Sequence, residues 1–492
     1  MRVSPLCVIG TVAYHRDMFK SRLAWAVFVA VIAVRVWVFA VSDNGIDGHH
    51  NAFDRPLFVE EWVQRGGWDP DPAYAPVHFY LLAALRVVTT NLDLAPQLLS
   101  LLCGLLAFWP LIVLARRWFG AEAAWWTGLA YAVFPLGVRV SALSLEVAPY
   151  LLFLALAFER LSKAWEGRRT NLGAALAGAF FLAVACATRF DGWTILPVVA
   201  VYAIWKDRRG GWLVAAVACS FPPLWMLHHW LIYHDPLHFL TISGGISAVH
   251  MAKVNLWDRL LAWPRILLFT TGPLLVAAAA VGAVSIRRRG PGRWLLAAFA
   301  LSLAVFMWRT ARGTFGANET KYAAALGLML LPFAGCGLAA IVRALSRSWR
   351  APASVVLAAA VAAAGLARIH ADNVDFAARP DLVATADWLA AHRDGLPVII
   401  GTRDQGFLII KGKIPRAARL LAETRDETGQ INVEQLQSMI DRPGRKFIVY
   451  DVLPDGLDFR TLLQPYFAGG GEHPHTFTPA FTSGAYTIYL VE

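Results

Sequence analysis

Long apolar runs fill the first three quarters of the chain. Each is close to the ~20 residues that an α-helix needs to cross the ~30 Å hydrocarbon core of a bilayer. They lie near residues 23–41, 96–115, 121–138, 145–161, 172–188, 192–205, 212–231, 265–285, 294–308, 323–342 and 352–369. The pattern predicts an α-helical polytopic membrane protein with about 11 spans.

After Arg368 the pattern becomes that of a soluble domain. A helical period occupies PDLVATADWLAAHRDG, and short β-rich runs follow in VIIGT, FLIIKG, KFIVYD and YTIYLV. Alternation of helix and strand predicts a small α/β domain over residues 370–492. We therefore expect three parts, an N-terminal segment (1–22), a transmembrane domain (23–369) and this C-terminal domain.

Basic residues gather in six clusters that occupy every second connection between the apolar runs. These clusters are Arg16/Lys20/Arg22, Arg116/Arg117, Lys163/Arg168/Arg169, Lys206/Arg208/Arg209, Arg287/Arg288/Arg289/Arg293 and Arg343/Arg347/Arg350. The positive-inside rule then predicts a cytoplasmic N-terminus in the cell (inner) membrane and an extracytoplasmic C-terminal domain. The apolar stretch Pro76–Val88 is too short to cross and carries Arg86, so we expect an interfacial helix within a first outer loop of about residues 42–95.

Composition agrees with a membrane protein. Hydrophobic residues make up 57% of the chain and charged residues 16%, which is more apolar than a soluble protein. The net charge of +11 arises from the clusters between spans, so it indicates topology and no nucleic-acid partner. Five cysteines are present but none lies in the polar C-terminal region, so cysteine usage does not decide its compartment.

The first outer loop is acidic. It reads DNGIDGHHNAFDRPLFVEEWVQRGGWDPDPAYAPVHFYLL. Asp54 precedes Arg55 and Pro56, so the simplest interpretation is that it caps a helix that starts at one of them. Capping does not exclude a catalytic role.

The segment FDRPLFVEEWVQRGGW resembles the region after the first span in GT-C class polytopic glycosyltransferases that use a polyprenyl-phosphate sugar. These include protein O-mannosyltransferases and the aminoarabinose transferase of lipid A. Asp54, Phe58, Gly67 and Trp68 occupy the family positions, although Arg55 stands where the family often has Glu and Phe58 where it often has Tyr. Further pieces agree in order over about the first 345 residues, namely YAPVHFYLL, LARRWFG, CATRFDGW, YHDPLHF and ETKYAAALGLMLLP.

The resemblance implies transfer of a sugar from a polyprenyl-phosphate donor to an acceptor hydroxyl at the outer face, with inversion. Polyprenyl phosphate is a reasonable leaving group, so the acceptor mainly needs a general base. We expect Asp54 to be this base. By resemblance, Glu146 is a second acidic group that orients the acceptor or the base; the alternative is a carboxylate at the start of the fourth span, favoured by the helix dipole. A glycan, lipid or protein acceptor remains open, and no nucleotide is required.

The departing phosphate needs cationic donors. Arg35 lies inside the first span, where a charge usually faces a cavity or partner but can also extend to the interface. Other basic residues lie in outer loops against the positive-inside trend, where an anionic lipid head gives a reason to keep them and ordinary surface duty is the alternative. The predicted substrate-binding set is Arg35, Lys253, Arg309, Lys321, Tyr322 and His78.

Histidines suggest a metal only weakly. Asp47, His49 and His50 lie together in the first outer loop, and a second group follows near the seventh span, His228, His229, His234, His238 and His250 with Asp235. Neither group has the spacing of a metal signature. We therefore expect the lipid-linked sugar donor and no other certain cofactor, with a divalent metal unsupported.

Two other classes of function explain part of the pattern. A transporter or flippase for a lipid-linked sugar accounts for many spans and a buried Arg35, but it predicts paired halves and several charges within spans. The chain has no internal repeat and its acidic residues lie in outer loops. A membrane-anchored sensor or scaffold that acts through its C-terminal domain gives no reason for the acidic first loop.

Overall fold

The computed structural model describes residues 22–42, 51–66, 74–167, 169–242, 254–286, 292–315, 320–375, 380–400, 405–420, 438–451 and 475–492. The chain divides into two compact units. Unit 1 comprises Met1–Val41, Phe58–Thr89 and Ala95–Val374, and unit 2 comprises Ser42–Leu57, Thr90–Leu94 and Asp375–Glu492. Two short pieces of the N-terminal half therefore pack with the C-terminal region.

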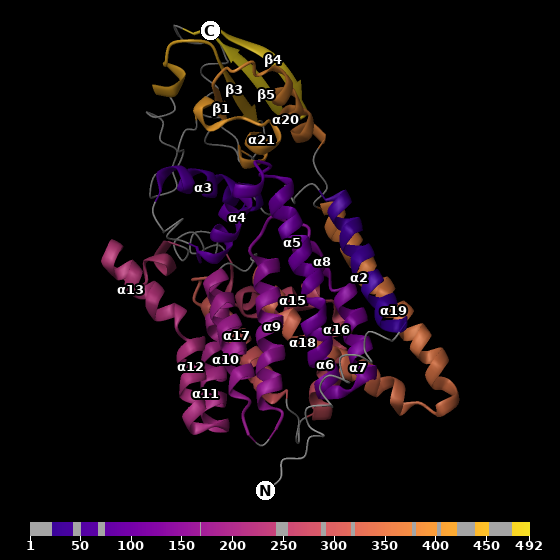
Figure 1. Ribbon diagram of the computed structural model, residues 1–492. Coiled ribbons are helices and arrows are strands. Elements are labelled where there is room, and N and C mark those ends of the chain that lie inside the picture. Colours follow the sequence, from indigo (N-terminus) through magenta and orange to yellow (C-terminus); the bar gives the residue numbers. More distant parts are fainter. Residues whose placement is uncertain are drawn as a thin grey trace. The chain divides into compact units, whose positions relative to one another are not determined.

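Unit 1 is built from helices (Figure 1). Helix α3 (Asn51–Arg65) starts in unit 2 and ends in unit 1. The other helices of unit 1 are α2 (Arg22–Val41), α4 (Val77–Val88), α5 (Leu94–Leu106), α6 (Phe108–Phe119), α7 (Ala121–Ala132), α8 (Pro135–Val140), α9 (Val147–Trp165), α10 (Leu172–Thr188), η1 (Phe190–Thr194), α11 (Leu196–Lys206), α12 (Arg208–Ala218), α13 (Phe221–Tyr233), α15 (Leu256–Thr271), α16 (Pro273–Ile286), α17 (Arg293–Ala311), η2 (Thr320–Tyr322), α18 (Ala323–Ala344) and α19 (Arg347–Asp375).

The predicted polytopic helical class is confirmed, whereas the number of spans is not. Among the described residues, five helices are long and apolar enough to cross a membrane, or seven if each of two bent pairs counts as one span. The pair α12 and α13 bends by 41°, and the pair α15 and α16 by 104°. The eleven apolar runs fall on helices, but several are divided by a break, as the run at 121–138 is between α7 and α8. The count of eleven remains a prediction.

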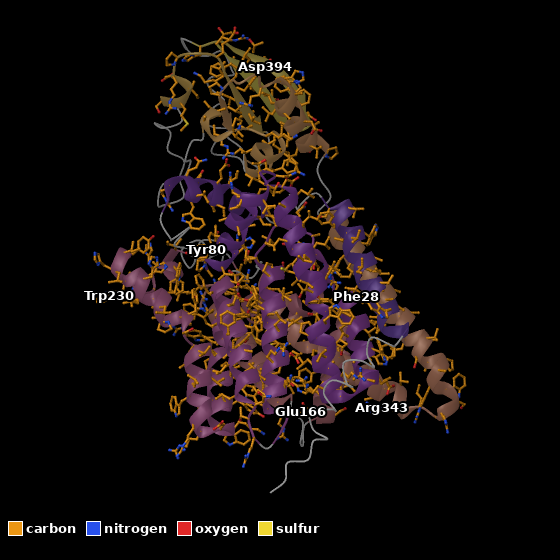
Figure 2. The ribbon with its side chains drawn as sticks, in the orientation of Figure 1. Phe28, Tyr80, Glu166, Trp230, Arg343 and Asp394 are labelled. Atoms are coloured by element: carbon orange, nitrogen blue, oxygen red, sulfur yellow. The ribbon has the colours of Figure 1, made fainter. Side chains whose placement is uncertain are left out.

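Helix α18 lies at the centre of unit 1 and packs closely on α16. A Cβ atom at Gly337 would lie 1.9 Å from the carbonyl oxygen of Ala278, and one at Gly282 would lie 2.0 Å from that of Phe333. Small residues allow two helix backbones to approach in this way. The outer helices instead expose apolar side chains, including Trp230, which is labelled in Figure 2. Such an exposed apolar surface suits contact with lipid.

Unit 2 contains a five-stranded sheet with the order β2-β1-β3-β5-β4. The strands are β1 (Val398–Ile400), β2 (Arg419–Leu420), β3 (Lys446–Asp451), β4 (Phe477–Ser483) and β5 (Tyr486–Val491). Strand β1 pairs in parallel with β2 and β3, while β5 pairs antiparallel with β3 and β4. Helix α20 (Pro380–His392) packs against β4 and β5 and against helix α21 (Gln405–Lys411). The small sheet expected from the sequence is present.

One element of this region differs from the sequence prediction. The run FLIIKG, predicted as a strand, forms the helix α21. A short apolar run carries no periodicity that separates a buried strand from a buried helix. Here Phe407, Leu408 and Ile409 are all buried, and the contact of α21 with α20 decides the outcome.

Candidate active site

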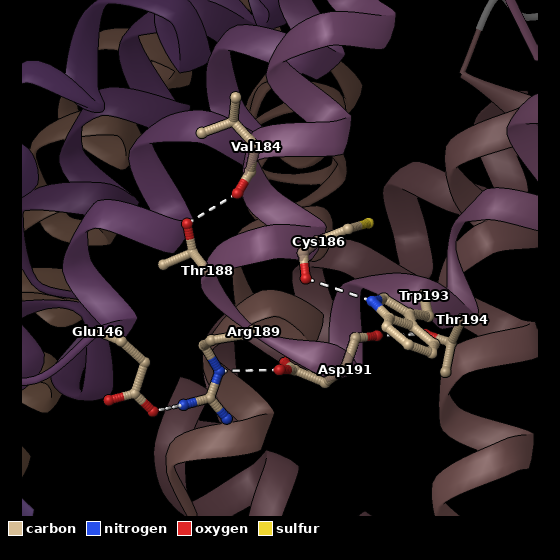
Figure 3. A network of polar contacts seen from close by, with 8 residues as sticks. All are labelled: Glu146, Val184, Cys186, Thr188, Arg189, Asp191, Trp193 and Thr194. Atoms are coloured by element: carbon tan, nitrogen blue, oxygen red, sulfur yellow. Dashed lines mark hydrogen bonds and ion pairs between the residues drawn. The ribbon is translucent and has the colours of Figure 1, made fainter. Parts of the chain in front are cut away.

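A buried polar network in unit 1 is centred on Arg189 (Figure 3). Its guanidinium forms an ion pair through Nη1 with Oε1 of Glu146 and a second through Nε with Oδ1 of Asp191, at 2.8 Å. All three side chains are at least nine-tenths buried. Removing charges from water is costly, and such a set is tolerated only when opposite charges and hydrogen bonds compensate it.

The ends of helices place these three residues. Helix α10 ends at Thr188, and Arg189 is extended, with φ −151° and ψ 137°, before the 3₁₀ turn η1. This turn carries Asp191, whose backbone oxygen accepts a 2.8 Å hydrogen bond from Thr194 Oγ1. Glu146 directly precedes α9, but its side chain forms no hydrogen bond with the first turn of that helix. The helix-start position expected for Glu146 is therefore observed, while its carboxylate is engaged by Arg189.

Aromatic rings flank the guanidinium. The Cζ atom of Arg189 lies 4.5 Å from the ring centre of Tyr322 and 5.8 Å from that of Tyr150, distances at which a cation is attracted to a ring face. The hydroxyl of Tyr150 interacts with the carboxylate of Asp191, whose second oxygen, Oδ2, is buried. Buried polar atoms are normally satisfied, and Tyr150 is the neighbouring group that can serve this oxygen.

Several of the predicted substrate-binding residues meet around this network. Lys321 is buried, with Nζ 5.8 Å from the ring centre of Tyr322. Phe315 packs at 4.6 Å from the same ring, and the Cζ of Arg309 lies 5.0 Å above the ring of Phe315. Arg309 also donates a 3.2 Å hydrogen bond from Nη2 to the carbonyl of Thr314. Glu146, Lys321, Tyr322 and Arg309 therefore belong to one connected group.

Arg35 lies elsewhere. It is fully buried on α2, donates from Nη2 to the carbonyl oxygen of Tyr131 at 3.2 Å, and stacks with Cζ 4.2 Å from the centre of that ring. Among the described residues its polar contacts are with Tyr131 and not with the Arg189 network. The hydroxyl of Tyr131 in turn donates to the carbonyl of Gly104 at 2.6 Å. Arg35 therefore links α2 to α7.

Asp54 lies in unit 2, within the first turn of α3. Because the helix begins at Asn51, Asp54 does not cap a helix starting at Arg55 or Pro56, and that interpretation is wrong. Burial raises the pKa of Asp54 to about 7, with the charge of Arg55 acting in the opposite direction. A carboxyl group that titrates near neutral pH suits a general base.

The structure describes only some of the remaining predicted site residues. His78 is fully buried on α4. Lys253 and the weak metal candidates Asp47, His49 and His50 lie outside the described residues. Within the described part of the chain, no group of three or more His, Cys, Asp or Glu side chains is arranged to hold a metal ion.

The sequence interpretation did not single out Arg189 or Asp191. Both lie in the quoted segment CATRFDGW, between two apolar runs. Ionisable residues between two apolar runs usually face a partner or a cavity. This position was therefore the sequence feature that could have identified Arg189 and Asp191 as site residues. Which partner Arg189 takes depends on how α9 and α10 pack, and local pattern does not give that.

Comparison with known proteins finds a similar family. Residues 72–225 match the family model described as dolichyl-phosphate-mannose-protein mannosyltransferase. This segment contains Glu146, Arg189 and Asp191. No curated protein sequence matches the chain significantly.

Solved structures match over nearly the whole chain. ArnT from Cupriavidus metallidurans bound to undecaprenyl phosphate is 14% identical, with a TM-score of 0.67 over 96% of this chain and 98% of that one. The oligosaccharyltransferase AglB from Archaeoglobus fulgidus, in complex with an inhibitory peptide and a dolichol-phosphate, is 14% identical with a TM-score of 0.55, over 92% of this chain and 71% of that one.

The chain shares its fold with ArnT and AglB, and the family match lies on the segment that carries the Arg189 network. These matches confirm the resemblance predicted from the sequence motifs.

Proposed function

We propose that the protein transfers a sugar from a polyprenyl-phosphate donor to an acceptor hydroxyl at the outer face of the membrane. The observation that carries the proposal is the buried Glu146–Arg189–Asp191 network within a segment that matches a lipid-phosphate-sugar-dependent family. The similar structures contain undecaprenyl phosphate and dolichol-phosphate, which supports a carrier of the same chemical class. The acceptor is a glycan, a lipid or a protein.

In the proposed reaction Asp54 takes the proton of the acceptor hydroxyl as its oxygen attacks the anomeric carbon. The bond from that carbon to the carrier phosphate breaks with inversion, and the lipid phosphate leaves. A pKa near 7 leaves a large fraction of Asp54 deprotonated at neutral pH. Glu146, fixed by Arg189, is assigned the orienting role.

The proposed topology has eleven spans, with the N-terminus (1–22) in the cytoplasm. Residues 370–492 then form an extracytoplasmic domain. This arrangement is supported by the six basic clusters in alternate connections.

We further propose that Arg35 and at least one of Lys253, Arg309 and Lys321 bind the carrier phosphate. A charge-assisted hydrogen bond contributes about 1.5–3 kcal/mol, so a single Ala substitution should weaken binding of undecaprenyl phosphate roughly 10- to 150-fold. Binding to purified protein in lipid nanodiscs measures this effect. Arg208→Ala, at an exposed residue on α12, is the matched control. Unchanged binding in all four variants would remove these residues from the carrier site.

The overall function is tested by the chemistry of the carrier. A glycosyltransferase converts polyprenyl-phosphate sugar into free polyprenyl phosphate, whereas a flippase moves the lipid across the bilayer intact. Vesicles with purified protein, a panel of undecaprenyl-phosphate sugars and a cell-envelope extract as acceptor distinguish the two by mass spectrometry. Release of undecaprenyl phosphate with a glycosylated product supports the proposal. Intact donor in the opposite leaflet contradicts it.

A further inference from the structure

The start of helix α21 packs directly on the segment that carries Asp54, and both belong to unit 2. The rings of Phe407 and Phe53 meet edge to face, with centres 5.3 Å apart and planes at 83°. Phe407 and Phe53 are each 2% exposed. The residue before the proposed base is therefore held in an apolar contact by a helix about 350 positions later in the chain.

The preceding residue, Gly406, leaves room for the carboxylate itself. A Cβ atom there would lie 2.7 Å from Oδ1 of Asp54 and 2.9 Å from Cβ of Phe53. Both distances are shorter than van der Waals contact between such atoms. The Asp54 oxygen can occupy its position only because residue 406 has no side chain.

Helix α21 is itself fixed within unit 2. Leu408 and Ile409 are buried, and the helix packs on α20. At its end, Lys411 forms a 2.6 Å ion pair with Asp93, which lies in the short piece Thr90–Leu94 of the same unit. The helix therefore contacts both of the N-terminal pieces that belong to this unit.

We infer that the C-terminal region positions and covers the Asp54 carboxylate through helix α21, with Phe407 and Gly406 as positioning residues. The inference rests on the proposed function for the meaning of Asp54 as a base. It assigns the C-terminal domain a part in preparing the base, in addition to any role in guiding the acceptor.

Burial of Asp54 has a measurable consequence. Among the described residues, the charged group that acts on Asp54 is Arg55, and it lowers the pKa of Asp54, while burial raises that pKa to about 7. Since the two effects oppose each other, loosening the cover should let the pKa fall toward its ordinary value.

The experiment is an infrared titration of the full-length protein between pH 4 and pH 9. The signal of Asp54 is the carboxyl band present in the wild type and missing in Asp54→Asn. Three variants are compared, namely Phe407→Leu, Gly406→Ala and the control Phe447→Leu. Phe447 is a buried ring of the same unit that packs on Trp388. Ala is a better helix former than Gly, so Gly406→Ala preserves the helix while displacing the carboxylate.

We expect a midpoint of about 7 in the wild type and in Phe447→Leu, and a midpoint lower by about one pH unit in Phe407→Leu and Gly406→Ala. Melting temperatures recorded in parallel test whether the control loses comparable packing. A midpoint that stays near 7 in both α21 variants, or a wild type with no such carboxyl, overturns the inference. If the midpoints shift as expected but Asp54→Asn retains turnover, the positioning stands and the proposed role of Asp54 fails.

Discussion

At the scale of single residues, the surroundings give two carboxylates different properties. Glu146 forms an ion pair with the buried guanidinium of Arg189. Asp54 is half-buried, and among the described residues the charged group acting on it is Arg55. Burial dominates there and raises its pKa. The structure thus separates a carboxylate held by an ion pair from a carboxyl group that can take up a proton near neutral pH.

Loss of Arg189 should destabilise unit 1 strongly. Arg189→Ala leaves the buried carboxylates of Glu146 and Asp191 without their shared cation, which typically destabilises by about 3–5 kcal/mol. Arg189→Lys keeps the charge but cannot hold two carboxylates with the planar geometry of Arg, so it should be intermediate. Thermal unfolding in detergent measures both variants. Equal melting temperatures for Arg189→Ala and wild type would show that the network contributes nothing to stability.

Some of the residues that form this site could be predicted from the sequence. Glu146, Arg309, Lys321 and Tyr322 were predicted as site residues and lie in one connected group, while their roles stay predictions. Arg189, which holds that group together, was missed because its partner Glu146 lies 43 positions before it and meets it only through the packing of α9 on α10. The role of Arg35 at the carrier phosphate stays a prediction; among the described residues its polar contacts are with Tyr131.

At the scale of elements, hydropathy located helices well and their breaks poorly. The run at 172–188 coincides with α10, but the run at 265–285 is divided between α15 and α16, which meet at a bend of 104°. Pro273 begins the second helix of this pair after Gly272, which has a φ of +92°. Average hydropathy over a window is insensitive to such a break, whereas glycine and proline at its position are informative.

The close packing of α16 on α18 gives a test at this scale. Gly337→Ala places a Cβ atom 1.9 Å from the carbonyl oxygen of Ala278, so the two helices must separate and stability should fall by about 1–3 kcal/mol. The control is Gly173→Ala in α10, where the added atom would lie 3.8 Å from its nearest neighbour, Asn171 Oδ1. It should be neutral or stabilise by about 0.5–1 kcal/mol. Comparable losses in the two variants would contradict close backbone approach as the cause.

At the scale of the whole molecule, the class followed from sequence while the division into units did not. The change of composition after Arg368 predicts a separate C-terminal domain. Nothing in the local pattern indicates that Ser42–Leu57 and Thr90–Leu94 pack with that region. Such long-range association depends on tertiary contacts, as the Phe53–Phe407 pair illustrates.

The proposed topology predicts which positions are accessible from outside the cell. In a cysteine-free background, Asp387→Cys on α20 should react with a membrane-impermeant thiol reagent in intact cells. Arg347→Cys at the start of α19 should react only after the cells are opened. Both side chains are exposed, so access is decided by the side of the membrane. The reverse pattern would overturn the orientation derived from the basic clusters.

The central claim, that Asp54 is the general base of a glycosyl transfer, is tested most directly by the turnover of Asp54→Asn. The measurement is the rate of product formation at pH 8 with saturating undecaprenyl-phosphate sugar, the donor being whichever member of the panel the wild type uses. Asn preserves the size of the side chain but cannot accept the proton. General-base assistance contributes about 10²–10⁴ in rate, so turnover should fall at least 100-fold, with undecaprenyl phosphate binding unchanged. An Asp54→Asn enzyme that keeps more than about a tenth of wild-type turnover contradicts the account, since that loss is below the lower bound for general-base catalysis.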